Sequence, residues 1–125
     1  MHTTETDPRT ARAYAVAYLR DVSVGPAIID YLQRIDESMA PYGGRFLVHG
    51  GALTPLEGTW DGDVVVLEFP DVRTAQDWYA SPAYQAILPL RTENSSSIAC
   101  VVQGVPVGYR ATHKLDELVG RGATA

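Results

Sequence analysis

The spacing of apolar side chains along this chain predicts four strands and two main helical segments. From Pro26 to Met39 the apolar residues recur every three or four positions, as on one side of an amphipathic helix. A second helical segment follows Asp71 and restarts at Ser81-Pro82, because a capping residue followed by proline is a typical helix start. Alternating or β-branched runs indicate strands at 13–20, 45–52, 63–69 and 98–105.

The resulting β-α-β-β-α-β order predicts an α+β fold of the ferredoxin-like type. Two right-handed crossovers place both helices on one face of a four-stranded antiparallel sheet. We expect the wholly apolar side of the strands, with Val65, Leu67 and Phe69, to lie under the helices. The open side is then mixed, which suits a second subunit and a pocket. We expect it to carry Tyr14, Tyr18, Arg45, Leu47, His49, Val64, Val66, Glu68 and Gln103.

The length of 125 residues fits one domain. Residues 1–12 are polar and are expected to form a mobile N-terminal tail. The domain itself is expected to span 13–105. We expect residues 106–125 to form a C-terminal extension with a short helix near 115–119.

The charge pattern argues against two classes of partner. The net charge is −5, and the Lys and Arg residues are scattered, so we expect neither a nucleic acid nor a membrane surface as partner. The N-terminus lacks the apolar segment of a signal peptide, which favours a cytoplasmic location. Cys100 is the single cysteine, so no internal disulfide can form, and its apolar surroundings predict a buried thiol.

His49 and Glu68 are the candidate catalytic residues. His49 is the one histidine inside a predicted strand, and imidazole is the usual general acid or base near neutral pH. Glu68, with the same predicted orientation on another strand, could polarise His49 or act as a base itself. The alternative interpretation is that Glu68 forms a structural ion pair with Arg45 or Arg91, and that His49 only lines the pocket.

Five further residues are candidates for binding a substrate. Arg45 and Arg91 could hold a carboxylate or enolate through the guanidinium fork, or could serve only to tie structural elements together. Tyr14 and Tyr18 could supply phenol donors and aromatic walls, although aromatic residues on strands often simply pack. Gln103 completes the set. The sequence has no phosphate-binding loop, dinucleotide fingerprint or zinc-ligand spacing, so we expect no organic cofactor and no metal.

Several blocks of the sequence together carry a family resemblance. They are Tyr42-Gly43-Gly44-Arg45-Phe46-Leu47 with Gly50-Gly51, Leu56-Glu57-Gly58 with Trp60, Val65-Val66-Leu67-Glu68-Phe69-Pro70, Trp78-Tyr79-Ala80-Ser81-Pro82-Ala83-Tyr84-Gln85, and Leu90-Arg91. Over about residues 13–105 the chain resembles the domain-of-unknown-function 1330 family. This resemblance implies a dimeric α/β barrel, in which two sheets pack face to face and a homodimer forms through the open sheet face. It assigns no role to His49.

These observations lead to one functional hypothesis and two alternatives. The hypothesis is a cofactor-independent enzyme that performs acid/base chemistry of the isomerase, cyclase or hydratase type on a small metabolite in a dimer pocket. One alternative is a non-catalytic small-molecule binding or stress-associated module. The other is a cofactor-free monooxygenase, whose substrate would have to form a stabilised carbanion. Fold-level analogy alone does not choose among them.

Overall fold

The computed structural model describes residues 11–120. Residues 1–10 of the predicted N-terminal tail lie outside the described residues. The elements follow in the order β1 (Ala13–Arg20), α1 (Pro26–Met39), a short 3₁₀ helix η2 (Ala40–Tyr42), β2 (Arg45–His49), β3 (Asp63–Phe69), α2 (Val72–Ala80), α3 (Pro82–Thr92), β4 (Ser96–Gln103) and α4 (Ala111–Gly120).

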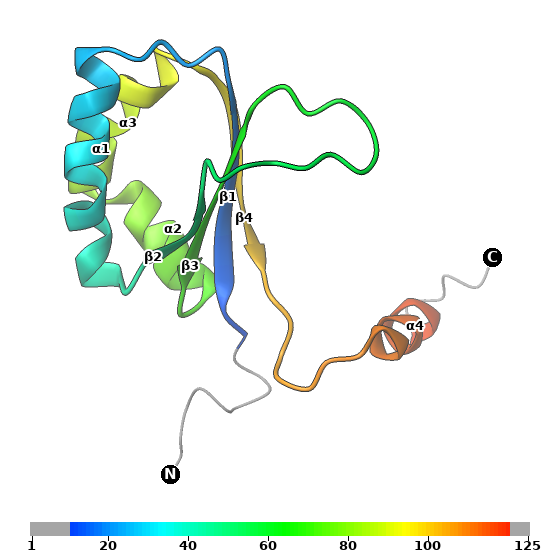
Figure 1. Cartoon of the computed structure of the whole chain (residues 1–125). Helices are drawn as coiled ribbons and strands as arrows, with labels where there is room; N and C mark the ends of the chain where they lie inside the picture. The colour runs from blue at the N-terminus through cyan, green and yellow to red at the C-terminus, as the bar shows by residue number, and fades with distance from the viewer. Residues whose placement is uncertain (1–10, 121–125) are drawn as a thin grey trace.

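The four strands form one antiparallel sheet in the order β2-β3-β1-β4. Helices α1, α2 and α3 all lie on one face of this sheet (Figure 1). No helix within the described part of the chain, residues 11–120, covers the other face (Figure 1). The predicted ferredoxin-like α+β fold is confirmed, including the division of the second helical segment into two pieces, α2 and α3.

Local sequence signals explain where the helices begin. Pro26 occupies the first turn of α1, where its missing N–H breaks no helical hydrogen bond. The side chain of Asp71 caps α2 by accepting a hydrogen bond from the Thr74 N–H at 2.7 Å. Ser81 has an extended backbone, which ends α2, and its hydroxyl accepts from the Tyr84 N–H at 3.2 Å to start α3.

The register of β1 and β3 confirms the predicted division of their side chains. Ala15 pairs with Leu67 on the helix-covered face, and Tyr14 pairs with Glu68 on the open face. The core under the helices is built from Phe69 and from apolar residues of all three covering helices. Phe69 has no exposed surface.

Strand β2 departs from the predicted alternation. Phe46 pairs with Leu67, but Val48 pairs with Val66, so that Leu47 is an extra residue in a β-bulge. Beyond a bulge, every side chain turns to the opposite face of the sheet. His49 therefore pairs with Val65 on the helix-covered face, and its predicted place on the open face was wrong.

The strand ends also differ from the prediction. β2 stops at His49, because Gly50 adopts a left-handed backbone with φ of 65° that leaves the strand. β4 runs from Ser96 to Gln103, two residues earlier than predicted at both ends. Gln103 pairs with Ala13, which places it on the helix-covered side and corrects the predicted open-face position.

Cys100 is exposed, so the predicted burial of its thiol was wrong for a single chain. Cys100 pairs with Val16, which lies two positions from Tyr14 in β1 and therefore on the same open face. Because no helix covers that face, an apolar sequence around Cys100 does not bury it.

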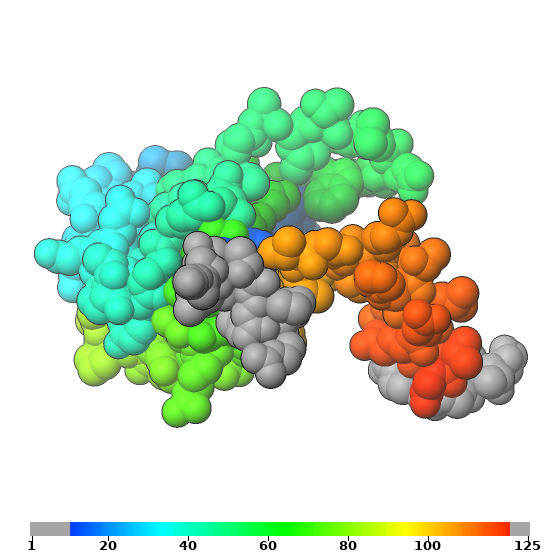
Figure 2. Space-filling view, turned by 90° about the horizontal axis from the view of Figure 1, so that it is seen from below, coloured from blue at the N-terminus to red at the C-terminus, as the bar shows by residue number. Residues whose placement is uncertain are grey.

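Two segments project from the domain on the side opposite to the helices (Figure 1). One is the long connection between β2 and β3, residues 50–62, and the other leads to α4. Seen from below, α4 stands apart from the main body of the domain (Figure 2). No helix within residues 11–120 has the length and apolar character needed to cross a membrane.

Candidate functional site

A cavity of about 580 Å³ lies between the sheet and the helices of a single chain. This volume falls in the usual range of small-molecule sites, roughly 300–1,000 Å³. This cavity lies on the covered face and was not predicted, whereas the pocket that we predicted between two copies on the open face stays a prediction. The cavity lining includes Ala15, Ala17, Leu19, Ile28, Tyr31, Leu32, Ile35, Phe46, His49, Asp63, Val65, Leu67, Trp78, Tyr84, Arg91, Ala99 and Val101.

Small side chains on the sheet explain why space remains under the helices. Ala15 and Ala17 of the central strand β1 and Ala99 of β4 all line the cavity. Ala17 and Ala99 are directly paired, so two methyl groups lie side by side on the cavity floor. Protein interiors are normally close-packed, and a void lined by short side chains is costly to leave empty. The alanines thus leave a space under the helices that is large enough for a small molecule.

Arg91 lines the cavity and is only 6% exposed. Its Nη1 donates a hydrogen bond to Ser97 Oγ at 2.6 Å. No ion pair found within residues 11–120 joins Arg91 to a carboxylate. A charged guanidinium is thus held at the cavity wall without an opposite charge among the described residues.

Two buried tyrosines accompany Arg91. The phenol oxygens of Tyr31 and Tyr84 lie 2.7 Å apart in a hydrogen bond. Burial raises the pKa of Tyr31 far above its ordinary value, and Tyr84 raises it further, so Tyr31 is a neutral phenol at physiological pH. Burial by itself lowers the pKa of Arg91, but the phenols of Tyr84 and Tyr31 outweigh it and the net pKa is raised. This cluster therefore presents one positive charge and neutral hydroxyl groups.

His49 and Asp63 lie at the exposed edge of the cavity. The imidazole stacks on the Phe46 ring, with centroids 4.3 Å apart and an angle of 14° between the planes. Asp63 pairs with Leu19, which puts it on the covered face, two residues before the Val65 that pairs with His49. The cavity mouth thus carries an imidazole and a carboxylate on neighbouring strands.

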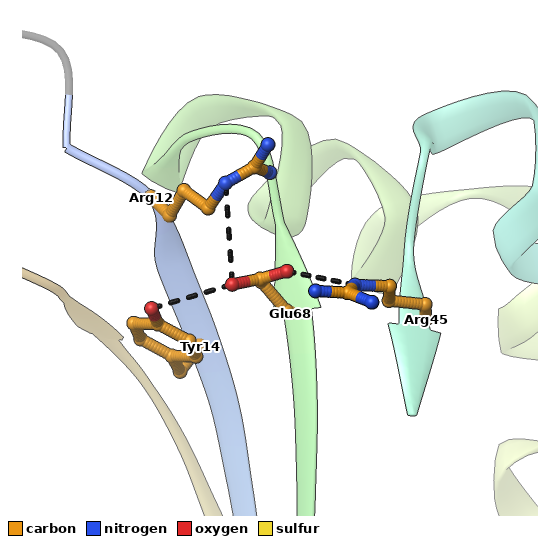
Figure 3. A network of polar contacts seen from close by, with 4 residues as sticks. All are labelled: Arg12, Tyr14, Arg45 and Glu68. Atoms are coloured by element: carbon orange, nitrogen blue, oxygen red, sulfur yellow. Dashed lines mark hydrogen bonds and ion pairs between the residues drawn. The ribbon is translucent and has the colours of Figure 1, made fainter. Parts of the chain in front are cut away.

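Glu68 lies on the opposite face of the sheet and belongs to a separate network (Figure 3). Arg45 Nε donates to Glu68 Oε1 at 2.8 Å, and the Tyr14 hydroxyl donates to Oε2 at 3.4 Å. Arg12 Nε adds a longer ionic contact of 4.0 Å. The predicted His49–Glu68 pair is not formed, because the bulge in β2 separates the two side chains. The ion pair of Glu68 with Arg45, the alternative interpretation, is present.

Of the seven predicted site residues, only His49 and Arg91 line the cavity. Tyr18 donates to Asp61 Oδ1 at 2.8 Å and contacts the Trp60 ring edge-on, so it holds the connection between β2 and β3. Tyr14 and Arg45 bind Glu68, and Gln103 lies at the exposed end of β4.

The sequence analysis missed Tyr31, Tyr84 and Asp63. Tyr31 shares the apolar side of α1 with Ile28 and Ile35, so helical spacing could have placed it under the helices. Asp63 alternates with Val65 and could have been assigned to the covered face. Among residues 11–120, no three or more His, Cys, Asp or Glu side chains are grouped so as to hold a metal ion.

Comparison with models of known protein families shows which family the chain belongs to. Residues 12–105 match the model of a domain of unknown function (DUF1330). The chain belongs to this family. The resemblance seen in the sequence is confirmed, and a search of curated proteins finds no match.

Solved structures with the same fold share little sequence with this DUF1330 protein. A protein of unknown function from Rhodopseudomonas palustris has a TM-score of 0.59 and 18% identity, over 79% of this chain and 86% of that one. SnoaB, a cofactor-independent oxygenase from Streptomyces nogalater, has a TM-score of 0.54 and 13% identity, over 80% and 99%. A dimeric ferredoxin-like protein of unknown function from Thermobifida fusca has a TM-score of 0.54 and 14% identity, over 82% and 100%. At such identities the similarity establishes the fold.

Proposed function

We propose that this protein is a cofactor-independent enzyme that moves protons on a small, largely apolar metabolite held in the cavity between sheet and helices. The reaction would be an isomerisation, cyclisation or hydration. The observation that carries the proposal is a cavity of about 580 Å³ with an apolar floor, a buried Arg91 in its wall and His49 at its mouth. An apolar pocket with a few convergent polar groups is the usual form of a small-molecule site.

Each polar group has a distinct part in this proposal. His49 is the general acid or base, since imidazole exchanges protons near neutral pH. Arg91 holds the oxygen on which negative charge develops, and its effect is strengthened because Arg91 itself is buried. Glu68 has no part in the chemistry, because it lies on the other face of the sheet and is paired with Arg45.

Cofactor-free oxygenation is a second candidate. It is favoured by one specific observation, the fold shared with SnoaB, which is named as a cofactor-independent oxygenase. The same cavity would then have to admit dioxygen beside a substrate that forms a stabilised carbanion. A binding module without turnover is the remaining alternative, and the experiment below separates it from an enzyme.

We also propose that two copies associate through the open sheet face. That face leaves Ile98 74% exposed and Val102 48% exposed on the edge strand β4. Clustered exposed apolar side chains of this kind mark an interaction surface. A neighbour of the same fold, from Thermobifida fusca, is described as dimeric. A cytoplasmic location remains our proposal from the sequence.

A cavity-filling substitution tests whether the cavity is the binding site. Ala17→Leu would place a larger side chain on the cavity floor, and Ala80→Leu makes the same change at an exposed position at the end of α2. With the neutral compound 2-naphthamide as probe, calorimetry should show binding to the wild type and to Ala80→Leu. Ala17→Leu should weaken binding at least about tenfold, because the probe and the new side chain need the same space. Equal binding to all three proteins would contradict the proposal.

Turnover is tested with a small-molecule extract of the cells that produce the protein. Mass spectrometry should show that the wild type and Ala80→Leu consume a compound that His49→Ala and Ala17→Leu leave unchanged. If 2-naphthamide binds in the cavity but no protein consumes any compound, the binding module is the better account.

A further inference from the structure

We propose that the cavity selects an organic anion, a compound with a planar apolar body and a single carboxylate or enolate group that binds Arg91. This inference rests on the proposed function in one respect, namely that the cavity is the substrate site. It adds the chemical class of the substrate and the residue that selects it.

Arg91 is buried without an opposite charge among the residues that the structure describes. It is 6% exposed and lines a cavity whose other side chains are mostly apolar. A buried ion is costly unless an opposite charge or several hydrogen bonds compensate it. Within residues 11–120 Arg91 has no carboxylate partner, so the missing negative charge is available for a ligand to supply.

The side chains that interact with Arg91 are neutral. Ser97 accepts one of its hydrogen bonds at 2.6 Å, and the hydroxyls of Tyr84 and Tyr31 also interact with the guanidinium. These three groups are neutral hydroxyls, which can hold the guanidinium in place but leave its charge unbalanced. A guanidinium has five N–H donors, more than these neighbours need, and its fork suits two oxygen atoms of one anionic group.

The rest of the cavity lining carries little negative charge. Within residues 11–120, Asp63 is the one acidic side chain that lines the cavity, and it is exposed at the mouth, where water screens it. His49 lies at the same mouth. The interior wall around Arg91 is therefore positive, and a neutral or cationic ligand would leave that charge unmatched.

The aromatic side chains of the lining indicate the shape of the ligand body. Trp78 and Tyr84 pack against each other with ring centroids 4.1 Å apart, and Phe46 lines the cavity from β2. Together with the flat floor of Ala15 and Ala17, these rings favour a planar apolar body.

The experiment compares two probes of nearly the same shape, 2-naphthoate and 2-naphthamide, by calorimetry on the full-length chain. The wild type should bind the carboxylate about tenfold or more tightly than the amide, as expected for a charge-assisted hydrogen bond to a buried guanidinium. Arg91→Gln should abolish this preference, so that the two probes bind with about equal affinity. Arg91→Lys, which keeps the charge without the fork, should retain part of it.

The control is Arg34→Gln, which removes a guanidinium from the surface of α1, where Arg34 contacts Asp30 rather than the cavity. It should preserve the wild-type preference. If Arg91→Gln does not fold, as judged by circular dichroism, the comparison of the two probes on the wild type still decides. Equal affinities for both probes would overturn the inference but leave the proposed site intact, whereas absence of binding by either would overturn both.

Discussion

The imidazole ring of His49 stacks on the ring of Phe46, with centroids 4.3 Å apart, and both side chains line the cavity. Phe46 and His49 are three positions apart, and in a regular strand they would point to opposite faces. The extra residue, Leu47, brings them to the same face. The bulge therefore turns His49 toward the cavity, as the proposed function requires.

Replacing Glu68 should affect stability rather than ligand binding. Glu68→Gln removes the charge that holds Arg45 and Arg12 on the open face, and we expect the free energy of unfolding to fall by about 1–2 kcal/mol. Urea denaturation measures this change. Glu37→Gln, at an exposed position on α1, should change stability by less than about 0.5 kcal/mol. If Glu68→Gln greatly weakened the binding of 2-naphthamide and left stability unchanged, Glu68 would have to be part of the binding site.

A methyl group at Gly44 should destabilise the core. A Cβ at this position would lie 2.5 Å from Cε1 of Phe69, a ring with no exposed surface and no room to move. Gly44→Ala should therefore cost about 1–3 kcal/mol of unfolding free energy. Gly51→Ala is the matched control, because a Cβ there meets nothing within 4 Å. Thermal melting of both variants gives the comparison, and equal melting temperatures would show that the packing around Gly44 is looser than described.

The cap of α2 should give stability that depends on pH. Asp71 accepts hydrogen bonds from the Thr74 hydroxyl and from the Thr74 N–H. These bonds, the first more than the second, hold the pKa of Asp71 below its ordinary value of 3.8. Because the folded pKa is depressed, the stabilisation is complete above about 3.8 and is lost as the pH falls through the folded pKa. At neutral pH, Asp71→Ala should lower the free energy of unfolding by about 1 kcal/mol.

Denaturation curves at several pH values test this cap. The difference between the wild type and Asp71→Ala should shrink as the pH is lowered below 3.8. Asp71→Asn keeps a capping oxygen without a charge, so its difference from Asp71→Ala should stay nearly constant. A gap between wild type and Asp71→Ala that does not change over this range would rule out the ionised carboxylate as the cap.

A charge on the open sheet face should separate the two copies. Ile98→Asp introduces a carboxylate at a position that is 74% exposed in one chain and covered in the proposed dimer. Light scattering should report 13.6 kDa for this variant and twice that mass for the wild type. Ile29→Asp, at a 49% exposed position on α1, should leave the dimer intact.

The reaction rate of the single cysteine, Cys100, provides a second test of the proposed dimer. Cys100 is exposed on the open face of one chain, so a dimer should slow its reaction with a thiol reagent. The Ile98→Asp variant should react faster than the wild type. A wild-type protein that scatters as 13.6 kDa and reacts at the variant's rate would contradict the dimer.

Much of the fold was predictable from spacing, because β1 and β3 alternate without interruption and the helices carry clear start signals. The residues that line the cavity were not predictable, and the reason for His49 lies in the local structure of β2. A bulge at Leu47 has no strong sequence signature, yet it reverses the face of every later residue in β2, His49 among them. Gly50 and Gly51 fall within the predicted strand 45–52, but they lie where the chain leaves the sheet after His49.

Arg91 could be proposed as a ligand-binding residue from the sequence, but its surroundings could not. Its neighbours Tyr31 and Ser97 come from α1 and β4, far apart along the chain, and only the packing of α3 brings them together. The cavity could not be predicted from the sequence either. Ala15 and Ala17 on β1 have the pattern of ordinary core residues, and only the structure shows the space above them.

The most direct test of the central claim is methyl NMR during titration with 2-naphthoate. We predict shifts for the methyl groups of Ala15, Ala17 and Val65 on the covered face, and none for those of Val66 and Ile98 on the open face. Shifts confined to Val66 and Ile98 would place the ligand on the open face and contradict the account.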